Sequence, residues 1–301
     1  MDVGMIGLGR MGANMAQRLL QGGHRVVGFD PDADARQRVA QRGAATVASL
    51  QALVAALVPP RAVWMMVPAG DITENTVTAL LPLLAAGDSL IDGGNSRYLD
   101  TMRRAALASA QRIDFIDCGT SGGVWGLAEG YSLMIGGDQA AVKRLTPLFV
   151  TLAPSADHGW GRVGPVGSGH YVKMIHNGIE YGMMQAYAEG FSILRHKHEF
   201  GLDVQQIAEI WRQGSVVRSW LLDLTAAALK ANPDLQGIAP FVADSGEGRW
   251  TVDEAIALNV PAPVITLSLL ERLRSRDTDS FSDRLLSALR NQFGGHEMKK
   301  D

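Results

Sequence analysis

The first half of the chain alternates between short apolar runs and longer stretches whose apolar residues recur at helical spacing. We predict strands over Val3–Gly7, Arg25–Asp30, Ala62–Pro68, Ser89–Gly93, Asp114–Cys118 and Ser132–Gly136. The predicted helices between them include Met11–Leu20, Ala33–Gln41, Thr73–Leu84 and Thr101–Ala110. Such alternation is typical of βαβ units, and it indicates an α/β domain with a doubly wound, mostly parallel sheet.

The pattern changes after the glycine-rich segment Trp160–Gly169, which we interpret as a connection. Beyond it, the apolar spacing predicts helices throughout. These run over His170–Arg195, Val204–Arg212, Ser219–Ala231, Thr251–Leu258, Pro263–Arg274 and Ser280–Asn291. We therefore expect two domains: the α/β domain over residues 1–165, and an all-helical domain over residues 166–301 that ends in a C-terminal tail.

The composition favours a soluble globular protein and excludes several functional classes. The 301 residues are 47% hydrophobic and carry a formal net charge of −3, which gives no electrostatic footprint for nucleic acid or an anionic membrane. Cys118 is the single cysteine, so neither an intrachain disulfide nor a cysteine zinc site can form. Because no long uncharged apolar run and no signal-peptide layout is present, we expect a cytoplasmic protein.

The string Gly7-Leu8-Gly9-Arg10-Met11-Gly12 follows the first predicted strand and opens the first predicted helix. This is the context of a dinucleotide-binding fingerprint. The first glycine permits a tight turn, the second lets the backbone approach the pyrophosphate, and the third allows close packing of helix on strand. The helix N-terminus attracts the phosphates. These six residues therefore predict a Rossmann-type cofactor site; the alternative is a glycine-rich turn in another α/β protein.

Asp30 ends the second predicted strand, where a carboxylate can accept hydrogen bonds from both ribose hydroxyls of a dinucleotide. Its charge repels a 2′-phosphate, so we expect NAD as the cofactor and NADP as a weaker alternative. Arg36 and Arg38 could soften this preference by reaching a phosphate, although a solvated helix face is the simpler explanation of both. Three more residues are candidates for cofactor binding: Val67, Pro68 and Asn95.

One face of the longest predicted helix carries four polar side chains. Lys173, His176, Asn177 and Glu180 stand at positions i, i+3, i+4 and i+7, so they project from the same side. This face offers a base, an acid and two groups that can orient a ligand by hydrogen bonds. Taken alone, the same pattern also fits a solvated surface helix.

Two loops follow predicted strands, at the edge where open α/β sheets bind ligands. They are Asp92-Gly93-Gly94-Asn95-Ser96 and Gly119-Thr120-Ser121-Gly122-Gly123. Asn95 and Ser121 can hydrogen-bond hydroxyl or carboxylate groups, and the glycines let a substrate approach backbone N–H groups. Plain turn chemistry is the alternative for each loop. We interpret Cys118, in the strand before the second loop, as a small buried residue rather than a nucleophile.

Three strings of the chain resemble those of the decarboxylating 6-phosphogluconate dehydrogenase family: Gly93–Ser96, Ser121–Gly123 and Lys173–Tyr181. The tail Arg290–His296 is also similar. The wider β-hydroxyacid dehydrogenase superfamily shares the fingerprint, a Ser-Gly-Gly loop and the Lys/Asn pair, whereas His176 and the pair Glu180–Tyr181 point to the phosphogluconate branch. The resemblance covers nearly the whole chain, which is shorter than the familiar long form and so resembles a short-chain, NAD-preferring subgroup.

The resemblance implies a function and a role for each polar residue of the helix. Lys173 would take the proton of the carbon-3 hydroxyl of 6-phosphogluconate while hydride leaves for NAD, and would then hydrogen-bond the ketone during loss of carbon dioxide. Glu180 would protonate carbon 1 of the product, ribulose 5-phosphate. His176 and Asn177 would orient the hydroxyls and the nicotinamide. No metal is needed, because the lysine serves as the electrophile.

The same resemblance implies how the phosphorylated sugar acid is held. Ser121, Gly122, Gly123 and Asn95 would line the substrate, and Tyr181 would lie on the phosphate side. Arg249 stands where long-chain members carry a lysine, and Arg276 matches a phosphate arginine, with Arg272 and Arg274 as rivals. Arg290 and His296 match tail residues that reach the phosphate of a neighbouring subunit, which implies a homo-dimer or homo-tetramer.

Two other functions fit parts of the sequence. A superfamily relative could act on a smaller β-hydroxy acid or semialdehyde, for which Arg290 and His296 would have no role. A dinucleotide-binding regulator without catalysis would not need the Lys173/Glu180 pair. His196 and His198 could suggest a metal, but histidines two residues apart on a helix do not face one site, so we interpret them as a solvated helix end.

Overall fold

The computed structural model describes residues 1–295 and 297–299. The chain divides into two compact units, Met1–Asn177 and Gly178–Asp301. The division falls inside one helix, α8 (Ser168–His196), whose first ten residues belong to the first unit.

Over the described residues, the strands of the first unit form one eight-stranded sheet in the order β3-β2-β1-β4-β5-β6-β7-β8. The strands are β1 (Asp2–Ile6), β2 (Arg25–Phe29), β3 (Ala45–Val47), β4 (Ala62–Met65), β5 (Ser89–Asp92), β6 (Asp114–Ser121), β7 (Ser132–Gly136) and β8 (Trp160–Gly164). Neighbouring strands are parallel except for the antiparallel pair β6–β7. The predicted doubly wound sheet is therefore confirmed.

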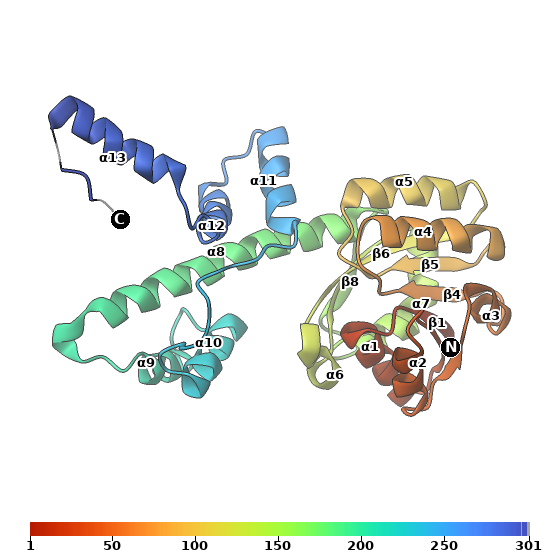
Figure 1. The fold of residues 1–301 in the computed structure, drawn as a ribbon. Coiled ribbons are helices and arrows are strands. Elements are labelled where there is room, and N and C mark those ends of the chain that lie inside the picture. Colours follow the sequence, from red (N-terminus) through yellow and green to blue (C-terminus); the bar gives the residue numbers. More distant parts are fainter. Residues whose placement is uncertain (296, 300–301) are drawn as a thin grey trace. The chain divides into compact units, whose positions relative to one another are not determined.

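Helices cover both faces of this sheet (Figure 1). The helices of the first unit are α1 (Arg10–Gln21), α2 (Ala33–Ala40), α3 (Leu50–Ala55), α4 (Asp71–Leu80), α5 (Tyr98–Ser109), α6 (Gly126–Glu129) and α7 (Gln139–Leu152). One apolar core lies between the sheet and α1, α2 and α7, and the other between the sheet and α3, α4 and α5. The central strand β4 is buried at every position, as expected for a strand covered on both faces.

The structure corrects the sequence interpretation at two strands. The segment Trp160–Gly169, interpreted as a connection, begins with β8, which pairs with β7 in parallel. The pattern also missed β3, which has only three residues. Neither strand offers a run of buried apolar side chains: all their residues are at least partly exposed, because β3 and β8 are the two edges of the sheet.

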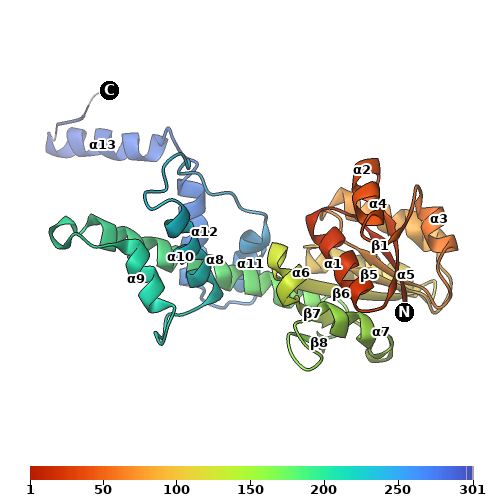
Figure 2. The same ribbon diagram turned by 90° about the horizontal axis from the view of Figure 1, so that it is seen from below.

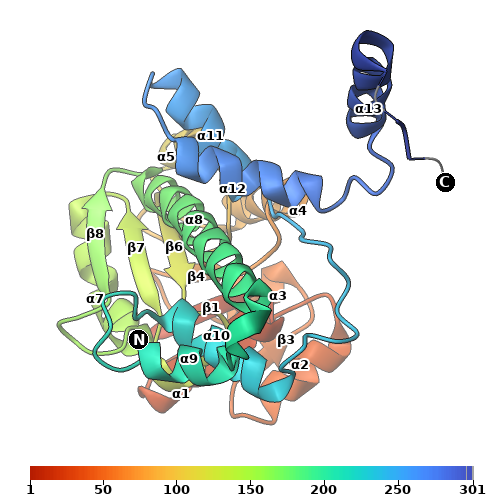
Figure 3. The ribbon, with the colours of Figure 1, turned by 90° about the vertical axis from the view of Figure 1, so that its left-hand side faces the viewer.

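The second unit is helical over its described residues, as predicted. It contains the rest of α8, followed by α9 (Val204–Trp211), α10 (Trp220–Ala231), α11 (Glu247–Ala257), α12 (Pro263–Arg274) and α13 (Phe281–Gly294). Tyr187 and Phe191 of α8 pack on an apolar cluster formed by α9 and α10, which lie side by side in Figure 2. Helices α11 and α12 also pack together, as Figure 3 shows. None of the helices in the described ranges is long and apolar enough to cross a membrane.

The first turn of α8 is fastened to the middle of β6 by the side chain of Asp117. This fully buried carboxylate accepts hydrogen bonds from the backbone N–H groups of Gly167, at 2.7 Å, and His170, at 2.8 Å. It thus caps the helix from another element, where a negative charge is stabilised by the helix dipole. Strands β6, β7 and β8 lie next to one another behind this turn (Figure 3).

Glycines let α8 approach the sheet at backbone distance. A Cβ atom on Gly169 would lie 2.5 Å from the carbonyl oxygen of Met134 and 2.6 Å from that of Asp117. A Cβ atom on Gly119 of β6 would lie 2.4 Å from the Cβ atom of Lys173. The position of Lys173 therefore depends on the absence of side chains at these two glycines.

We predict that Gly169→Ala destabilises the protein by about 1–3 kcal/mol, because the added methyl group meets backbone atoms that cannot turn away. The melting temperature should fall by several degrees, as measured by circular dichroism. The matched control is Gly161→Ala in β8, where an added Cβ atom meets no heavy atom within 4 Å and should leave the melting temperature unchanged or slightly raised. Equal melting temperatures for the two variants would contradict this account of the contact.

Candidate active site

The fingerprint residues form the tight turn between β1 and α1. Gly7 has φ +85°, and a Cβ atom there would lie 2.4 Å from the carbonyl oxygen of Met66. A Cβ atom on Gly12 would lie 1.9 Å from the carbonyl oxygen of Gly7, so only glycine lets α1 pack so closely. Gly9, the N-cap of α1, faces open space, and no side chain caps the helix there. The exposed helix N-terminus beside Gly9 fits the pyrophosphate of a dinucleotide.

The other fingerprint residues border the same turn. Leu8 is buried, whereas Arg10 is exposed at the first position of α1 and Met11 is half-buried. The backbone N–H of Leu8 donates to Asp30 Oδ2 at 2.7 Å. The sequence thus brings the carboxylate at the end of β2 to the glycine turn after β1, which is where an adenosine ribose would need it.

Asp30 is held by its own neighbours as well. Its Oδ1 atom accepts from the backbone N–H of Asp32 at 2.9 Å. Arg36 donates to the backbone carbonyl of Asp30 at 2.7 Å, and Arg38 lies 3.7 Å from the carboxylate of Asp32. Arg36 therefore binds the backbone of Asp30, and Arg38 faces the carboxylate of Asp32 and not that of Asp30. The fixed carboxylate and these engaged arginines fit NAD better than NADP.

Val67 and Pro68 follow β4 and lie between the glycine turn and the Gly94 loop. A Cβ atom on Gly7 would lie 3.1 Å from Val67 Cγ1, and one on Gly94 would lie 2.8 Å from the Val67 carbonyl oxygen. Thr73 of α4 donates to the carbonyl of Pro68 at 2.9 Å. The side chain of Asn95 is exposed at the tip of the Gly94 loop. The three candidates, which come from two loops, thus lie along one edge of the sheet.

Three of the four polar residues on α8 are joined by short contacts. Lys173 is 7% exposed, and its Nζ atom donates to Asn177 Oδ1 at 2.7 Å and lies 3.3 Å from His176 Nδ1. His176 Nδ1 is 3.1 Å from Asn177 Oδ1. A largely buried amine beside an amide and an imidazole can exchange a proton with a ligand while its position stays fixed.

The Ser-Gly-Gly loop lies at the end of β6, the strand against which Lys173 packs. Ser121 is the last residue of β6, and both Gly122, at φ +127°, and Gly123, at φ +50°, adopt backbone conformations that favour glycine. Gly123 faces open space. Cys118, in the same strand, is fully buried, and burial raises the pKa of its thiol, which agrees with a packing residue and not a nucleophile.

The remaining candidates belong to the second unit. Glu180 continues the polar face of α8 and is half-buried. The ring of Tyr181 is buried, and the guanidinium of Arg272 stacks on it, with Cζ 3.5 Å from the ring centroid. A Cβ atom on Gly248 would lie 2.5 Å from the same ring, so α11 packs closely against α8 here.

Two of the candidate phosphate residues converge on one acid. Arg249 donates to both oxygens of Asp244, at 3.0 and 3.2 Å, and Arg276 donates to Oδ2 at 2.7 Å. These contacts, the first of them from Arg249, lower the pKa of Asp244 to about 2. Of the two rivals, Arg274 binds the carboxylate of Asp283, whereas Arg272 stacks on Tyr181. The arginine cluster is thus prearranged around a buried carboxylate.

Two candidates belong to the C-terminal tail, Arg290 and His296. Arg290 is exposed on α13. His296 lies outside the described residues. The Nδ1 atom of His196 donates to the backbone carbonyl of Ser192 at 2.7 Å, at the C-terminal end of α8. Over the described residues, no group of three histidine, cysteine or acidic side chains could hold a metal ion.

Sequence reasoning missed the residues that support these candidates. They are Asp92, which binds the loop of Asn95, Asp117, which binds the start of α8, and Asp244, which binds Arg249 and Arg276. Asp92 could have been found, since an aspartate two residues before a glycine often accepts a hydrogen bond from that backbone. For Asp117 the sequence offers no local signal, because its partners lie 50 and 53 residues away. Of the partners of Asp244, Arg276 lies 32 residues away, and Arg249, five residues away, is an exposed arginine of an ordinary surface type.

Comparison with known proteins gives a consistent result along the whole chain. Residues 2–161 match the family model described as the NAD binding domain of 6-phosphogluconate dehydrogenase. Residues 169–293 match the model described as the 6-phosphogluconate dehydrogenase C-terminal domain.

Two relatives match the chain from end to end. An NAD(+)-dependent, decarboxylating 6-phosphogluconate dehydrogenase of Haloferax volcanii is 46% identical over 100% of this chain and 99% of its own length. A putative 6-phosphogluconate dehydrogenase of Bacillus subtilis is 42% identical over all of both chains. The solved structure of Plasmodium falciparum 6-phosphogluconate dehydrogenase superposes with a TM-score of 0.85 at 27% identity, covering all of this chain and 66% of that one.

Proposed function

Because the chain belongs to the 6-phosphogluconate dehydrogenase family, we propose that it oxidises and decarboxylates 6-phospho-D-gluconate, with NAD as the hydride acceptor. The products are D-ribulose 5-phosphate and carbon dioxide. The observation that carries this proposal is the full-length match, at 46% identity, to an NAD(+)-dependent, decarboxylating relative. The buried Lys173–Asn177 contact on α8 supplies the matching chemistry.

NAD, when bound, accepts the hydride that leaves carbon 3 of the substrate. The turn Gly7–Gly12 and the N-terminus of α1 would hold its pyrophosphate, and Asp30 would accept hydrogen bonds from the ribose. Val67, Pro68 and Asn95 would border the nicotinamide half. The open face of Gly9 and the uncapped first turn of α1 support this assignment.

Lys173 is the proposed base and electrophile. As a neutral amine it takes the proton of the carbon-3 hydroxyl while the carbon–hydrogen bond breaks and the hydroxyl becomes a ketone. As an ammonium it then donates a hydrogen bond to that ketone oxygen. The bond to the carboxylate breaks next and carbon dioxide leaves, while the bonding electrons form a carbon–carbon double bond and the ketone oxygen takes a proton from Lys173 to give an enol. This proton returns to Lys173 when the carbon is protonated in the last step. Asn177 and His176 hold Lys173 and orient the substrate hydroxyls.

Glu180 is the proposed acid of the last step. It protonates the carbon from which carbon dioxide has left, and this carbon becomes carbon 1 of ribulose 5-phosphate. Glu180 stands seven residues after Lys173 on one helix, about 10 Å further along the axis. To act on neighbouring carbons of one substrate, the two side chains must therefore lean toward each other along the helix face.

The rest of the substrate is assigned to the loops and to the arginine cluster. Ser121, Gly122, Gly123 and Asn95 would hydrogen-bond the carboxylate and the hydroxyls. Tyr181, Arg249 and Arg276 would bind the phosphate, and the carboxylate of Asp244 supports this role by holding both arginines in place. In this scheme residues 1–165 form the cofactor domain and residues 166–301 the substrate and oligomerisation domain.

We also propose that the protein is a cytoplasmic homo-dimer or homo-tetramer in which the tail of one subunit completes the site of its neighbour. Arg290 and His296 would reach the phosphate there. The exposed face of α13 supports the proposal: Phe281, Leu285, Leu286 and Leu289 are all at least 46% exposed. An apolar stripe of this kind on a terminal helix is typical of a surface that packs on another subunit.

Purified protein given 6-phosphogluconate and NAD should form NADH, ribulose 5-phosphate and carbon dioxide in equal amounts. Lys173→Met should lower kcat by about 10²- to 10⁴-fold, because the proton acceptor is lost. Lys197→Met is the matched control, since Lys197 contacts Glu199 beyond the end of α8, and it should keep full activity. A folded wild type that turns over only a phosphate-free β-hydroxy acid would refute the proposed substrate.

Asp30→Ser should change the cofactor preference. Loss of the carboxylate removes an acceptor for the ribose hydroxyls and the charge that repels a 2′-phosphate. We expect kcat/KM to fall roughly tenfold with NAD and to rise roughly tenfold with NADP, each equivalent to about 1.4 kcal/mol. Asp34→Ser, on an exposed carboxylate of α2, is the control. If Asp30→Ser and Asp34→Ser gave the same ratio of NAD to NADP activity, the role of Asp30 would be disproved.

The shared site predicts complementation between two defective variants. Lys173→Met and Arg290→Ala each impair every site in their own oligomer. A randomly mixed dimer of the two contains one doubly defective site and one intact site. Mixtures that are unfolded and refolded together should recover about a quarter of wild-type activity. Recovery no greater than the average of the two variants alone would mean that each site is built from one chain.

A further inference from the structure

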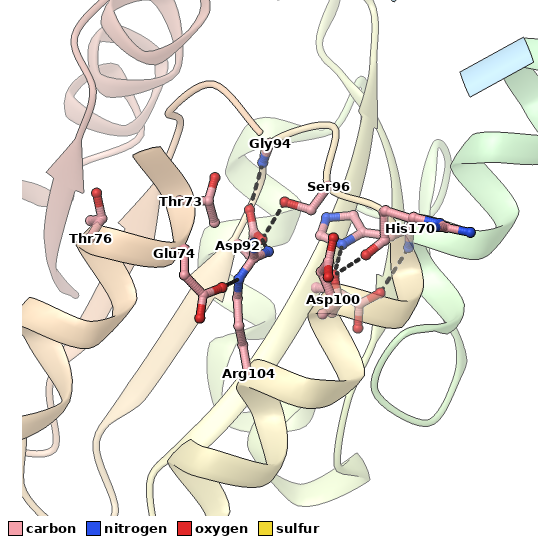
Figure 4. Close-up of polar contacts among 12 residues, drawn as sticks. Thr73, Glu74, Thr76, Asp92, Gly94, Ser96, Asp100, Arg104 and His170 are labelled. Carbon is pink, nitrogen blue, oxygen red and sulfur yellow. Dashed lines mark hydrogen bonds and ion pairs between the residues drawn. The ribbon is translucent and has the colours of Figure 1, made fainter. Parts of the chain in front are cut away.

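The side chain of Asp92 binds the loop that carries Asn95 by two hydrogen bonds. Asp92 ends β5, and its side chain is fully buried. Its Oδ1 atom accepts from the backbone N–H of Gly94 at 3.1 Å, and its Oδ2 atom accepts from the hydroxyl of Ser96 at 2.7 Å (Figure 4). These two hydrogen bonds stand on either side of Asn95, so one carboxylate fixes the backbone from which the exposed Asn95 side chain projects.

A buried carboxylate needs a compensating charge, and Arg104 of α5 supplies it. Its Nη1 atom lies 3.9 Å from Asp92 Oδ2, and the side chain is 2% exposed. Within the described residues this Nη1 atom has no hydrogen-bond partner, so the contact to Asp92 is one of charge. Removing Arg104 would leave Asp92 as an unpaired buried anion, which is strongly unfavourable.

Arg104 is held in place from α4. Its Nε atom donates to Glu74 Oε2 at 2.8 Å (Figure 4). Glu74 also accepts two hydrogen bonds from the neighbouring Arg103, at 2.7 and 2.6 Å. The contacts of Arg103 first, and then those of Arg104, lower the pKa of Glu74 to about 2, so it stays ionised at any physiological pH. A continuous series of charges thus runs from α4 through α5 to the loop of Asn95.

The same helix α5 is joined to the start of α8. Thr101, one turn before Arg104, lies with its Oγ1 atom 2.7 Å from Nδ1 of His170. His170 is buried and stands one turn before Lys173. One face of α5 therefore contacts both the loop of Asn95 and the first turn of the helix that carries the proposed base.

We propose that Arg104 is a positioning residue for the reaction: through Asp92 it fixes Asn95 in the geometry that binds the nicotinamide and the substrate. Arg104 itself touches neither ligand, because it is buried beneath the loop. The inference rests on the proposed function in one respect, the assignment of Asn95 as a ligand contact. A residue that only stabilised the fold would act independently of Asn95, whereas a positioning residue acts through it.

A double-mutant cycle separates these two roles. It compares the wild type, Arg104→Met, Asn95→Ala and the combined variant by kcat/KM for 6-phosphogluconate. We expect Arg104→Met to lower kcat/KM on the order of 10- to 100-fold when Asn95 is present, as for a misplaced binding group. In the Asn95→Ala background the same substitution should cost less than about threefold. Equal losses in both backgrounds, or no loss in either, would overturn the proposal.

Arg103→Met is the matched control for the charge and for Glu74. Arg103 is the adjacent arginine and binds the same carboxylate, but its side chain is 52% exposed and its ion pairs are with Glu74 and Asp100. It should change kcat/KM less than about threefold in either background, as is usual for an exposed ion pair. A loss as large as that of Arg104→Met would show that Glu74, and not the link to Asp92, governs activity.

If Arg104→Met does not fold, Arg104→Met is introduced instead into an Asp92→Asn background, which lacks the charge of Asp92. Asp92→Asn keeps an oxygen for Gly94 and an amide for Ser96, and it leaves no buried anion for Arg104 to balance. Adding Arg104→Met to Asp92→Asn should therefore cost less than about threefold in kcat/KM. A loss of 10-fold or more would show that Arg104 acts by another route and would overturn the proposal.

A failure of the proposed function can be told apart from a failure of this inference. If the wild type binds NADH but does not turn over 6-phosphogluconate, the proposed substrate is wrong, and the cycle is then measured by the dissociation constant of NADH. The same dependence on Asn95 is expected there. Additive changes in the NADH dissociation constant would overturn the positioning role whatever the substrate is.

Discussion

The buried carboxylate of Asp117 is the contact on which the arrangement of the candidate site depends. It accepts two backbone hydrogen bonds at the start of α8, so that helix begins at a fixed point on β6. Ser121 lies four residues after Asp117 on β6, and Lys173 lies six residues after Gly167. The distance between the loop that begins at Ser121 and the proposed base is therefore set by one side chain and by the glycines that let the helix approach. Like a serine or aspartate N-cap, Asp117 accepts hydrogen bonds from backbone N–H groups at the start of the helix. Because it stands on β6, it also joins the helix to the sheet.

The same device recurs at the other parts of the site. In each case a fully or partly buried carboxylate holds a group of the candidate site by hydrogen bonds. Asp30 holds the glycine turn through Leu8, Asp92 holds the loop of Asn95, and Asp244 holds Arg249 and Arg276. Hydrogen bonds to charged groups are stronger than neutral ones, and a carboxylate can accept several at once. The candidate ligand contacts, which are glycines, an amide and arginines, thus depend on acids. Asp92 and Asp244 would not meet the ligands themselves, whereas Asp30 would also bind the ribose.

The sequence predicted those parts of the structure that follow from local periodicity. The strands around β4, the turn at Gly7 and the polar face of Lys173, His176 and Asn177 could be found because each depends on residues close in sequence. The edge strand β8 could not, since Trp160–Gly164 is rich in glycine and exposed, and only its pairing with β7 makes it a strand. The supporting acids were missed for a related reason. Aspartates are common on surfaces, and nothing near Asp117 or Asp244 in sequence shows that they are buried against distant partners.

Helix α8 carries a consequence for how this chain can vary in length. Lys173 and Glu180 lie on one uninterrupted helix, on either side of the point where the two compact units divide. Each residue added to a helix turns everything beyond it by about 100°. A single insertion after Asn177 would carry Glu180 away from the face that it shares with Lys173, together with Tyr181 behind it. A substitution in this stretch changes one side chain, whereas a change of length would rotate every later residue of the helix to another face. The number of residues here is therefore as strict a requirement as their identity.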